Sequence, residues 1–163
     1  MDLDQDFKEF IQLVNINKVQ YLVVGGYAVA FHGYIRYTSN IDFWIKPEKE
    51  NVARLVKSLI EFGYNPLDIE KEDFIKENLV FQLGHPPNRI DIMTSVTGLV
   101  FDECWKERKE LEMEDEKLNF ISLHHLKINK KQTGRSIDKN DLENLGGTSE
   151  DKKNGMDTKE ILK

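Results

Sequence analysis

Two aspartates lie in separate segments that alternate apolar and polar side chains, and such a pair could bind a cation. In residues 40–45 the odd-numbered positions are apolar and Asp42 falls on the opposite side, as the period of two of a strand requires. Asp91 alternates in the same way within residues 90–93. Adjacent strands lie about 4.8 Å apart, so the two carboxylates could converge on one magnesium ion or on a pair of metal ions. The alternative is a half-exposed sheet whose polar face carries aspartates that bind nothing.

A pair of glycines, Gly25 and Gly26, follows the apolar segment 21–24, which is typical of a short buried strand. A short helix is expected after the glycines, over residues 27–33. Backbone N–H groups at the start of a helix favour phosphate, through hydrogen bonds and through the helix dipole. Most glycine pairs mark only a tight turn, but here the order is informative, because Asp42 and then Asp91 follow on later strands.

This order resembles the signature of the DNA polymerase beta-like nucleotidyltransferase superfamily. In that superfamily a hydrophobic-Gly-Gly turn precedes an Asp-hydrophobic-Asp strand, and a third carboxylate lies on a later strand. The sequence also resembles a bacterial subgroup of small stand-alone nucleotidyltransferases related to abortive-infection (type IV toxin) enzymes. The resemblance covers roughly residues 20–145. The residues that carry it are Gly25-Gly26-Tyr27-Ala28-Val29, His32-Gly33, Arg36, Thr38, Asp42, Lys130, Thr133-Gly134-Arg135, Asp138 and Asp141-Leu142.

The resemblance implies a Mg²⁺-dependent enzyme, with Mn²⁺ as a substitute ion, that moves an NMP from an NTP to an acceptor hydroxyl. The acceptor could be a protein, an RNA or a small molecule. By resemblance the metal ligands are Asp42, Asp91 and Asn40, the catalytic residues are Asp42 and Asp91, with Asp91 as general base, and the nucleotide-binding residues are Gly25, Gly26, Arg36 and Lys130.

Asn40 departs from the pattern, because the superfamily has an aspartate at this position. An asparagine keeps one neutral oxygen ligand but loses a charge, so one metal site should weaken. This favours a second hypothesis, a catalytically impaired nucleotide-binding or regulatory module that acts with a partner protein as half of a toxin–antitoxin pair.

A basic segment, residues 124–140, carries five bases and one acid in an otherwise acidic chain. Lys127, Lys130 and Lys131 are spaced to share one face of a helix, which could contact phosphate or, alternatively, be a solvated face. The resemblance implies phosphate contact at Lys130 alone. Trp44 shares the strand face of Asp42, where it could stack on a base or pack under the site.

Composition limits the class of protein. The chain has 163 residues, with 29 acids against 23 bases and a formal net charge of -6, which argues against indiscriminate binding of nucleic acid. A single cysteine, Cys104, indicates a reducing compartment. The acidic N-terminus and the lack of a long apolar run predict a cytoplasmic protein without membrane association. We expect one nucleotidyltransferase-like domain over residues 1–145 and a disordered tail over residues 146–163.

The pattern of predicted elements mixes helices with short strands. Helices are expected over residues 7–14, 47–62, 123–132 and 138–145, strands over residues 21–24 and 40–45, a hairpin over residues 79–83 and 90–93, and a solvated, partly helical acidic flank over residues 101–117. The predicted class is α+β, a mixed β-sheet flanked by helices with a polymerase beta-like nucleotidyltransferase core.

Overall fold

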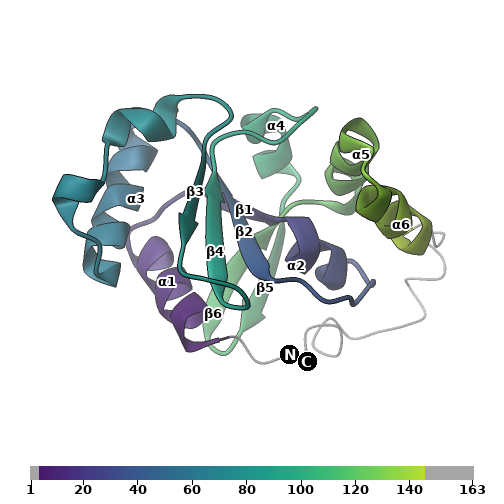
Figure 1. Ribbon diagram of the computed structural model, residues 1–163, viewed down its shortest axis with the longest axis horizontal. Helices are drawn as coiled ribbons and strands as arrows, with labels where there is room; N and C mark the ends of the chain where they lie inside the picture. Colours follow the sequence, from purple (N-terminus) through teal and green to yellow (C-terminus); the bar gives the residue numbers. More distant parts are fainter. Residues whose placement is uncertain (1–3, 146–163) are drawn as a thin grey trace.

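The computed structural model describes residues 4–145, which form a mixed six-stranded sheet flanked by helices (Figure 1). The strand order is β3-β4-β2-β1-β6-β5. In chain order the elements are α1 Gln5–Ile16, β1 Tyr21–Val24, α2 Gly25–Phe31, β2 Asn40–Ile45, α3 Lys49–Phe62, two 3-10 helices Pro66–Asp68 and Lys71–Ile75, β3 Val80–Leu83, β4 Arg89–Met93, α4 Phe101–Lys106, β5 Lys109–Met113, β6 Glu116–Phe120, α5 Leu123–Thr133 and α6 Ser136–Leu145.

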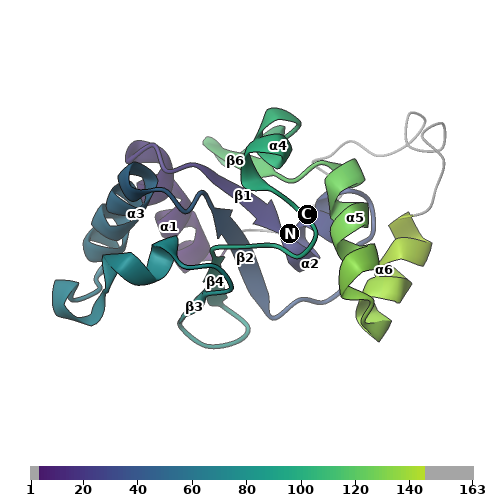
Figure 2. The same ribbon diagram turned by 90° about the horizontal axis from the view of Figure 1, so that it is seen from above.

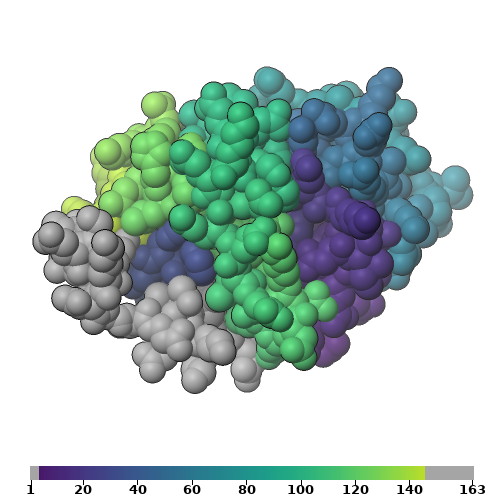
Figure 3. All heavy atoms as spheres, turned by 180° about the vertical axis from the view of Figure 1, so that it is seen from behind, coloured from purple at the N-terminus to yellow at the C-terminus, as the bar shows by residue number. Residues whose placement is uncertain are grey.

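The helices form two groups that lie apart. Helices α1 and α3 pack against each other, and α5 and α6 form a second pair at the other end of the molecule (Figures 1 and 2). Seen from behind, the segment from α4 to β6 lies between α1 and the α5–α6 pair (Figure 3). Within residues 4–145 no helix is long and apolar enough to cross a membrane.

Burial of the apolar side of β2 determines the direction in which its polar side chains point. Ile41, Phe43 and Ile45 are buried, and the Phe43 ring packs edge-on against Phe10 of α1 and Tyr21 of β1, with centroids 5.0 and 5.3 Å apart. A register slip by one residue would turn all three apolar side chains toward the opposite face. Burial of this face therefore directs Asp42 and its even-numbered neighbours to the other side of the sheet.

Most predicted elements are confirmed, including the α+β class with a mixed sheet. Helix α3 ends at Gly63, whose φ of 122° is a conformation that favours glycine. Asp4 caps α1 by accepting a hydrogen bond from the backbone N–H of Asp6 at 2.9 Å. Helix α6 begins at Ser136, two residues before the expected start. The predicted tail, residues 146–163, lies outside the described residues.

The partly helical acidic flank predicted over residues 101–117 is confirmed over α4, Phe101–Lys106, and wrong beyond it. After the short helix α4, the chain forms the hairpin β5–β6, in which β6 pairs with β1 inside the sheet. Among the described residues strand β5 pairs only with β6, so Glu110 and Glu112 are exposed at the edge of the sheet. Lys117 forms an ion pair with Glu110 at 2.8 Å. Charged side chains are typical of an edge strand, and here they masked the strand pattern.

Candidate active site

The two aspartates singled out in the sequence lie side by side on neighbouring strands. Strands β2 and β4 are parallel, and their register pairs Asp42 with Asp91 and Asn40 with Arg89. Paired residues on adjacent strands face the same side of the sheet. Four polar side chains therefore form one cluster, which we call the carboxylate site: Asn40, Asp42, Arg89 and Asp91.

Hydrogen bonds connect every member of the carboxylate site. The Asn40 amide Nδ2 donates to Asp42 Oδ1 and, at 3.2 Å, to Asp91 Oδ2. Arg89 donates through Nε to Asp91 Oδ1 at 2.7 Å and through a terminal nitrogen to Asp91 Oδ2 at 3.0 Å. This two-pronged pairing fixes the orientation of Asp91. Arg89 is not among the site residues predicted from the sequence, although its spacing of two from Asp91 places both on one strand face.

The glycine pair lies directly against this cluster. A Cβ on Gly25, whose φ is 66°, would overlap Asp42 Oδ2. A Cβ on Gly26 would come within 2.6 Å of the Thr38 hydroxyl. Only residues without side chains let the start of α2 approach β2 this closely. The structure thus brings Gly25, Gly26, Asp42 and Asp91 together.

Asp42 lies in an environment that disfavours its charge. Burial, and next the negative charge of Asp91, raise the pKa of Asp42 to about 7, although Arg89, Lys130 and the Asn40 hydrogen bond act in the opposite direction. Near neutral pH this carboxyl is therefore partly protonated. A cation placed beside Asp42 would favour its ionised form.

Protonation of Asp42 should appear in the pH dependence of stability. The unfolded carboxyl ionises near pH 3.8, whereas the folded one keeps its proton up to about pH 7. Relative to Asp42→Asn, we expect the free energy of unfolding of the protein to fall by about 3 kcal/mol between about pH 4 and pH 7 and to change little above that range. Urea denaturation of both proteins across this range measures the difference. Parallel pH curves would show that Asp42 ionises normally.

The two predicted triphosphate contacts, Lys130 and Arg36, are held by aspartates of α6. Lys130 is 3% exposed and its Nζ lies 3.1 Å from Asp138 and 2.9 Å from Asp141. Arg36 donates to both oxygens of Asp141 at 2.6 and 2.8 Å. Lys130 still acts on the carboxylate site, because its charge lowers the pKa of Asp42.

The basic helix face predicted for α5 is therefore wrong in one respect. Lys131 is exposed, but Lys130 points inward to two aspartates that are themselves fully buried. Burial alone would raise the pKa of Asp138, but hydrogen bonds from Arg135, Thr133 and Lys130 lower it below its ordinary value. These ion pairs fasten α5 to α6 and, through Arg36, to the loop that leads into β2.

Removal of the Lys130 charge should cost much of the stability. We expect Lys130→Met to lower the free energy of unfolding by about 3 kcal/mol, because it leaves buried carboxylates without one of their partners. Urea denaturation tests this, with the exposed neighbour Lys131→Met as a matched control that changes stability by less than about 0.5 kcal/mol. Equal effects of the two substitutions would contradict the buried network.

The donors of the carboxylate site fit one divalent cation. Mg²⁺ commonly binds one or two carboxylates and completes its shell with water and substrate phosphates. Asp42 and Asp91 supply two carboxylates, and Asn40 can add its Oδ1 if the amide turns over. Within residues 4–145 no group of three or more His, Cys, Asp or Glu side chains is arranged to hold a metal. Two carboxylates and an amide thus suit one ion that the substrate helps to bind.

Trp44, for which base stacking was one alternative, packs within the protein. Its ring is 2% exposed and meets Phe101 of α4 edge-on, with centroids 5.1 Å apart. The packing alternative is therefore the one that the structure favours.

Comparison with known proteins identifies the fold. No protein-family model matches the chain, and no curated protein matches it. Among solved structures, the lincosamide antibiotic adenylyltransferase LnuA, in a crystal structure with lincomycin bound, is similar over 90% of this chain and 98% of that chain, with 18% identity and a TM-score of 0.58. Identity this low establishes the fold and not the reaction. The α+β chain described here has the nucleotidyltransferase fold of LnuA, as the resemblance implied.

Proposed function

We propose that this protein is a nucleotidyltransferase that moves an NMP from an NTP to an acceptor hydroxyl with the help of one divalent cation, Mg²⁺ or in its place Mn²⁺. The observation that carries the proposal is the pairing of Asp42 with Asp91 directly beside Gly25. This arrangement lies in a fold that the chain shares with an adenylyltransferase.

Each residue of the carboxylate site has a role in the proposed reaction. Asp42, Asp91 and the Oδ1 of Asn40 would hold the cation, which supplies charge stabilisation for the triphosphate and the attacking oxygen. Arg89 fixes the orientation of Asp91 through its two hydrogen bonds. Asp91 would also act as the general base, as the resemblance implies. Asp42 must give up its proton before the cation can bind.

The remaining predicted residues would act on the nucleotide. We place the phosphates at the backbone N–H groups that follow Gly25 and Gly26. The two glycines carry no side chain that would block this place, and Asp42 and Thr38 lie too close to leave room for one. Arg36 and Lys130 contribute positive potential from their places in the α6 network rather than direct coordination. In the displacement, the acceptor hydroxyl gives its proton to Asp91 while its oxygen forms a bond to the α-phosphorus; the bond between the α-phosphorus and the oxygen that bridges to the β-phosphate breaks, and pyrophosphate leaves with that oxygen.

The acceptor that we favour is a small molecule. The structural neighbour is an antibiotic adenylyltransferase with lincomycin bound, and the chain covers 98% of its length. A protein or RNA acceptor, a cytoplasmic location and a partner in a toxin–antitoxin pair remain predictions from the sequence.

A second candidate function is nucleotide binding without transfer. Asn40 favours it, because its amide nitrogen donates to both carboxylates and must turn away before Oδ1 can serve a cation. The two functions differ in turnover and agree in nucleotide binding.

Isothermal titration with ATP, GTP, CTP and UTP in the presence of Mg²⁺ tests the shared part of the proposal. We expect saturable heat with at least one nucleotide, and we expect it to disappear in Asp42→Ala. The absence of heat with all four nucleotides would overturn both candidate functions.

A further inference from the structure

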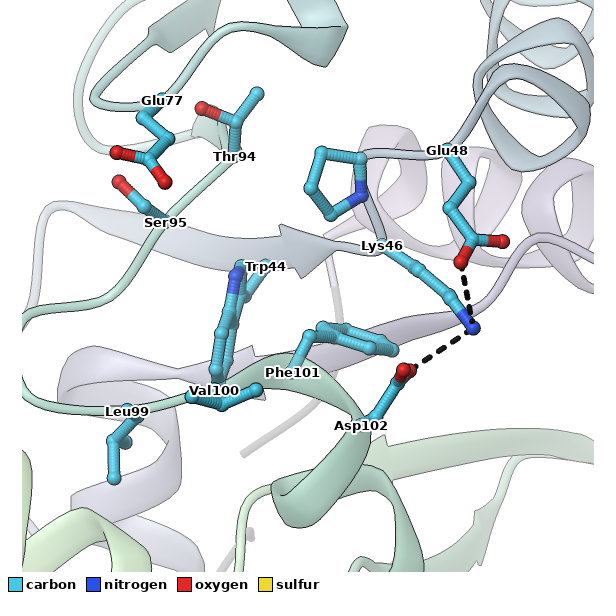
Figure 4. Close-up of a pocket in the computed structure, with 11 residues that line it drawn as sticks. Trp44, Lys46, Glu48, Glu77, Thr94, Ser95, Leu99, Val100, Phe101 and Asp102 are labelled. Carbon is cyan, nitrogen blue, oxygen red and sulfur yellow. Dashed lines mark ion pairs between the residues drawn. The ribbon is translucent and has the colours of Figure 1, made fainter.

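A cavity lies on the same side of the sheet as the carboxylate site. Its volume is about 300 Å³, and it lies between the end of β2, the segment that follows β4, and helix α4 (Figure 4). Its lining includes two rings from β2 and α4, Trp44 and Phe101, and two hydroxyl side chains, Thr94 and Ser95. We call it the Trp44 cavity.

The Trp44 cavity lies one side-chain step from the paired aspartates. Trp44 follows Asp42 by two residues on β2 and is paired with Met93, which follows Asp91 by two residues on β4. Residues two apart on a strand share a face and lie roughly 7 Å apart along it. A molecule of modest size in this cavity could therefore place a hydroxyl at the carboxylate site.

The floor of the cavity is apolar. Figure 4 shows the Trp44 and Phe101 rings next to each other, with Leu99 and Val100 beside them. The Trp44 indole N–H is covered from solvent and has no hydrogen-bond partner among the residues that the structure describes. Because solvent does not reach this N–H, the cavity presents apolar surface to a ligand rather than this donor.

The rim of the cavity is negatively charged. It carries three carboxylates, those of Glu48, Glu77 and Asp102, and one ammonium, that of Lys46. Lys46 is occupied by ion pairs with Glu48 at 3.2 Å and Asp102 at 2.9 Å (Figure 4). The remaining negative charge favours a cation over aromatic rings and repels the phosphates of a nucleic acid.

We propose that the Trp44 cavity binds the acceptor, and that the acceptor is a small alcohol that carries a protonated amine and an apolar ring. The inference rests on the proposed function, since it names the acceptor class of the same site. It sets aside RNA, because a polyanion in this cavity would lie against the carboxylates of Glu77 and Asp102.

Three phenols that differ only in charge test the inference. Tyramine ends in an ammonium group, tyrosol in a neutral hydroxyl and 4-hydroxyphenylacetate in a carboxylate. Each is titrated into ¹⁵N-labelled protein while the two indole N–H signals, from Trp44 and Trp105, are followed by NMR. Trp44→Phe assigns its signal by removing it. We expect tyramine to shift the Trp44 signal more than that of Trp105 and to bind at least about fivefold more tightly than tyrosol, while the carboxylate probe binds more weakly than either.

Charge variants provide the matched control. Glu77→Gln and Asp102→Asn should each reduce the advantage of tyramine over tyrosol about two- to fivefold, whereas Glu112→Gln on the far edge of the sheet should leave it unchanged. A Trp44 signal that no probe shifts, or equal binding of all three probes, would overturn the inference.

Failure of the inference and failure of the proposed function give different results. If ATP with Mg²⁺ binds but tyramine does not, the Trp44 cavity is not the acceptor site and the nucleotidyltransferase proposal stands. If tyramine binds but no nucleotide does, the cavity is a ligand site and the nucleotidyltransferase proposal is overturned.

Discussion

The Asp42→Asn variant should lose nucleotidyl transfer by at least about 100-fold while it remains folded. Asp42 is paired with Asp91 across two strands and lies against Gly25, so its carboxylate would contact both cation and substrate. An asparagine of nearly the same shape keeps an oxygen for the Asn40 hydrogen bond but brings no charge to the cation. Radiolabelled NMP transfer measures the loss, and urea denaturation confirms that the variant folds.

A matched substitution separates this effect from a general loss of negative charge. Asp115 lies in the exposed β5–β6 turn with a positive φ of 66°, a conformation that asparagine tolerates well. Asp115→Asn should therefore transfer at the rate of the unmodified protein. Retention of full activity by Asp42→Asn would show that the reaction centre lies elsewhere.

The reverse change at the neighbouring position should raise activity. We expect Asn40→Asp to increase transfer about 10- to 100-fold and to tighten Mg²⁺ binding about tenfold, because a third carboxylate replaces a neutral amide beside the cation. Without Mg²⁺ the same variant should be less stable by about 1 to 3 kcal/mol near pH 8, since three carboxylates then lie together with Arg89 as the cation that pairs with one of them. Transfer assays and urea denaturation, each with and without Mg²⁺, measure both effects.

Asn65→Asp is the control for this change. Asn65 is exposed, and its side-chain oxygen caps the 3-10 helix that begins at Pro66, a role that aspartate also fills. It should alter neither transfer nor the response to Mg²⁺. If Asn40→Asp were no more active than the unmodified protein and nucleotide still bound, catalysis would be limited by something other than the charge at this position.

Local sequence patterns could predict the elements in which apolar residues recur at regular spacing. Strand β2 alternates strictly, and the stripe of α3 runs without interruption to Gly63. These local patterns, with the spacing of strands in a sheet, left the convergence of Asp42 and Asp91 as one of two alternatives, and the resemblance to the superfamily favoured it. The hairpin β5–β6 could not be recognised from the sequence because β5 lies at the edge of the sheet. Its charged side chains contact water there, so the strand lacks a regular apolar pattern.

The partners of Arg36 and Lys130 could not be predicted from spacing. Arg36 meets Asp141 across 105 positions of sequence, and Lys130 points inward only because α6 folds back along α5. A lysine in a basic segment is ordinarily solvated, so nothing local distinguished the buried Lys130 from the exposed Lys131. Arg89 was overlooked for a different reason: its role depends on the register that places it opposite Asn40.

The most direct test of the account is a crystal structure with Mn²⁺ and a non-hydrolysable ATP analogue, in which anomalous scattering locates the ion. The account predicts one Mn²⁺ bound by Asp42, Asp91 and the nucleotide phosphates, with carboxylate oxygens at about 2.1 Å and the phosphates beside Gly25 and Gly26. An ion that contacts neither aspartate, or a nucleotide bound away from the glycine pair, would contradict it.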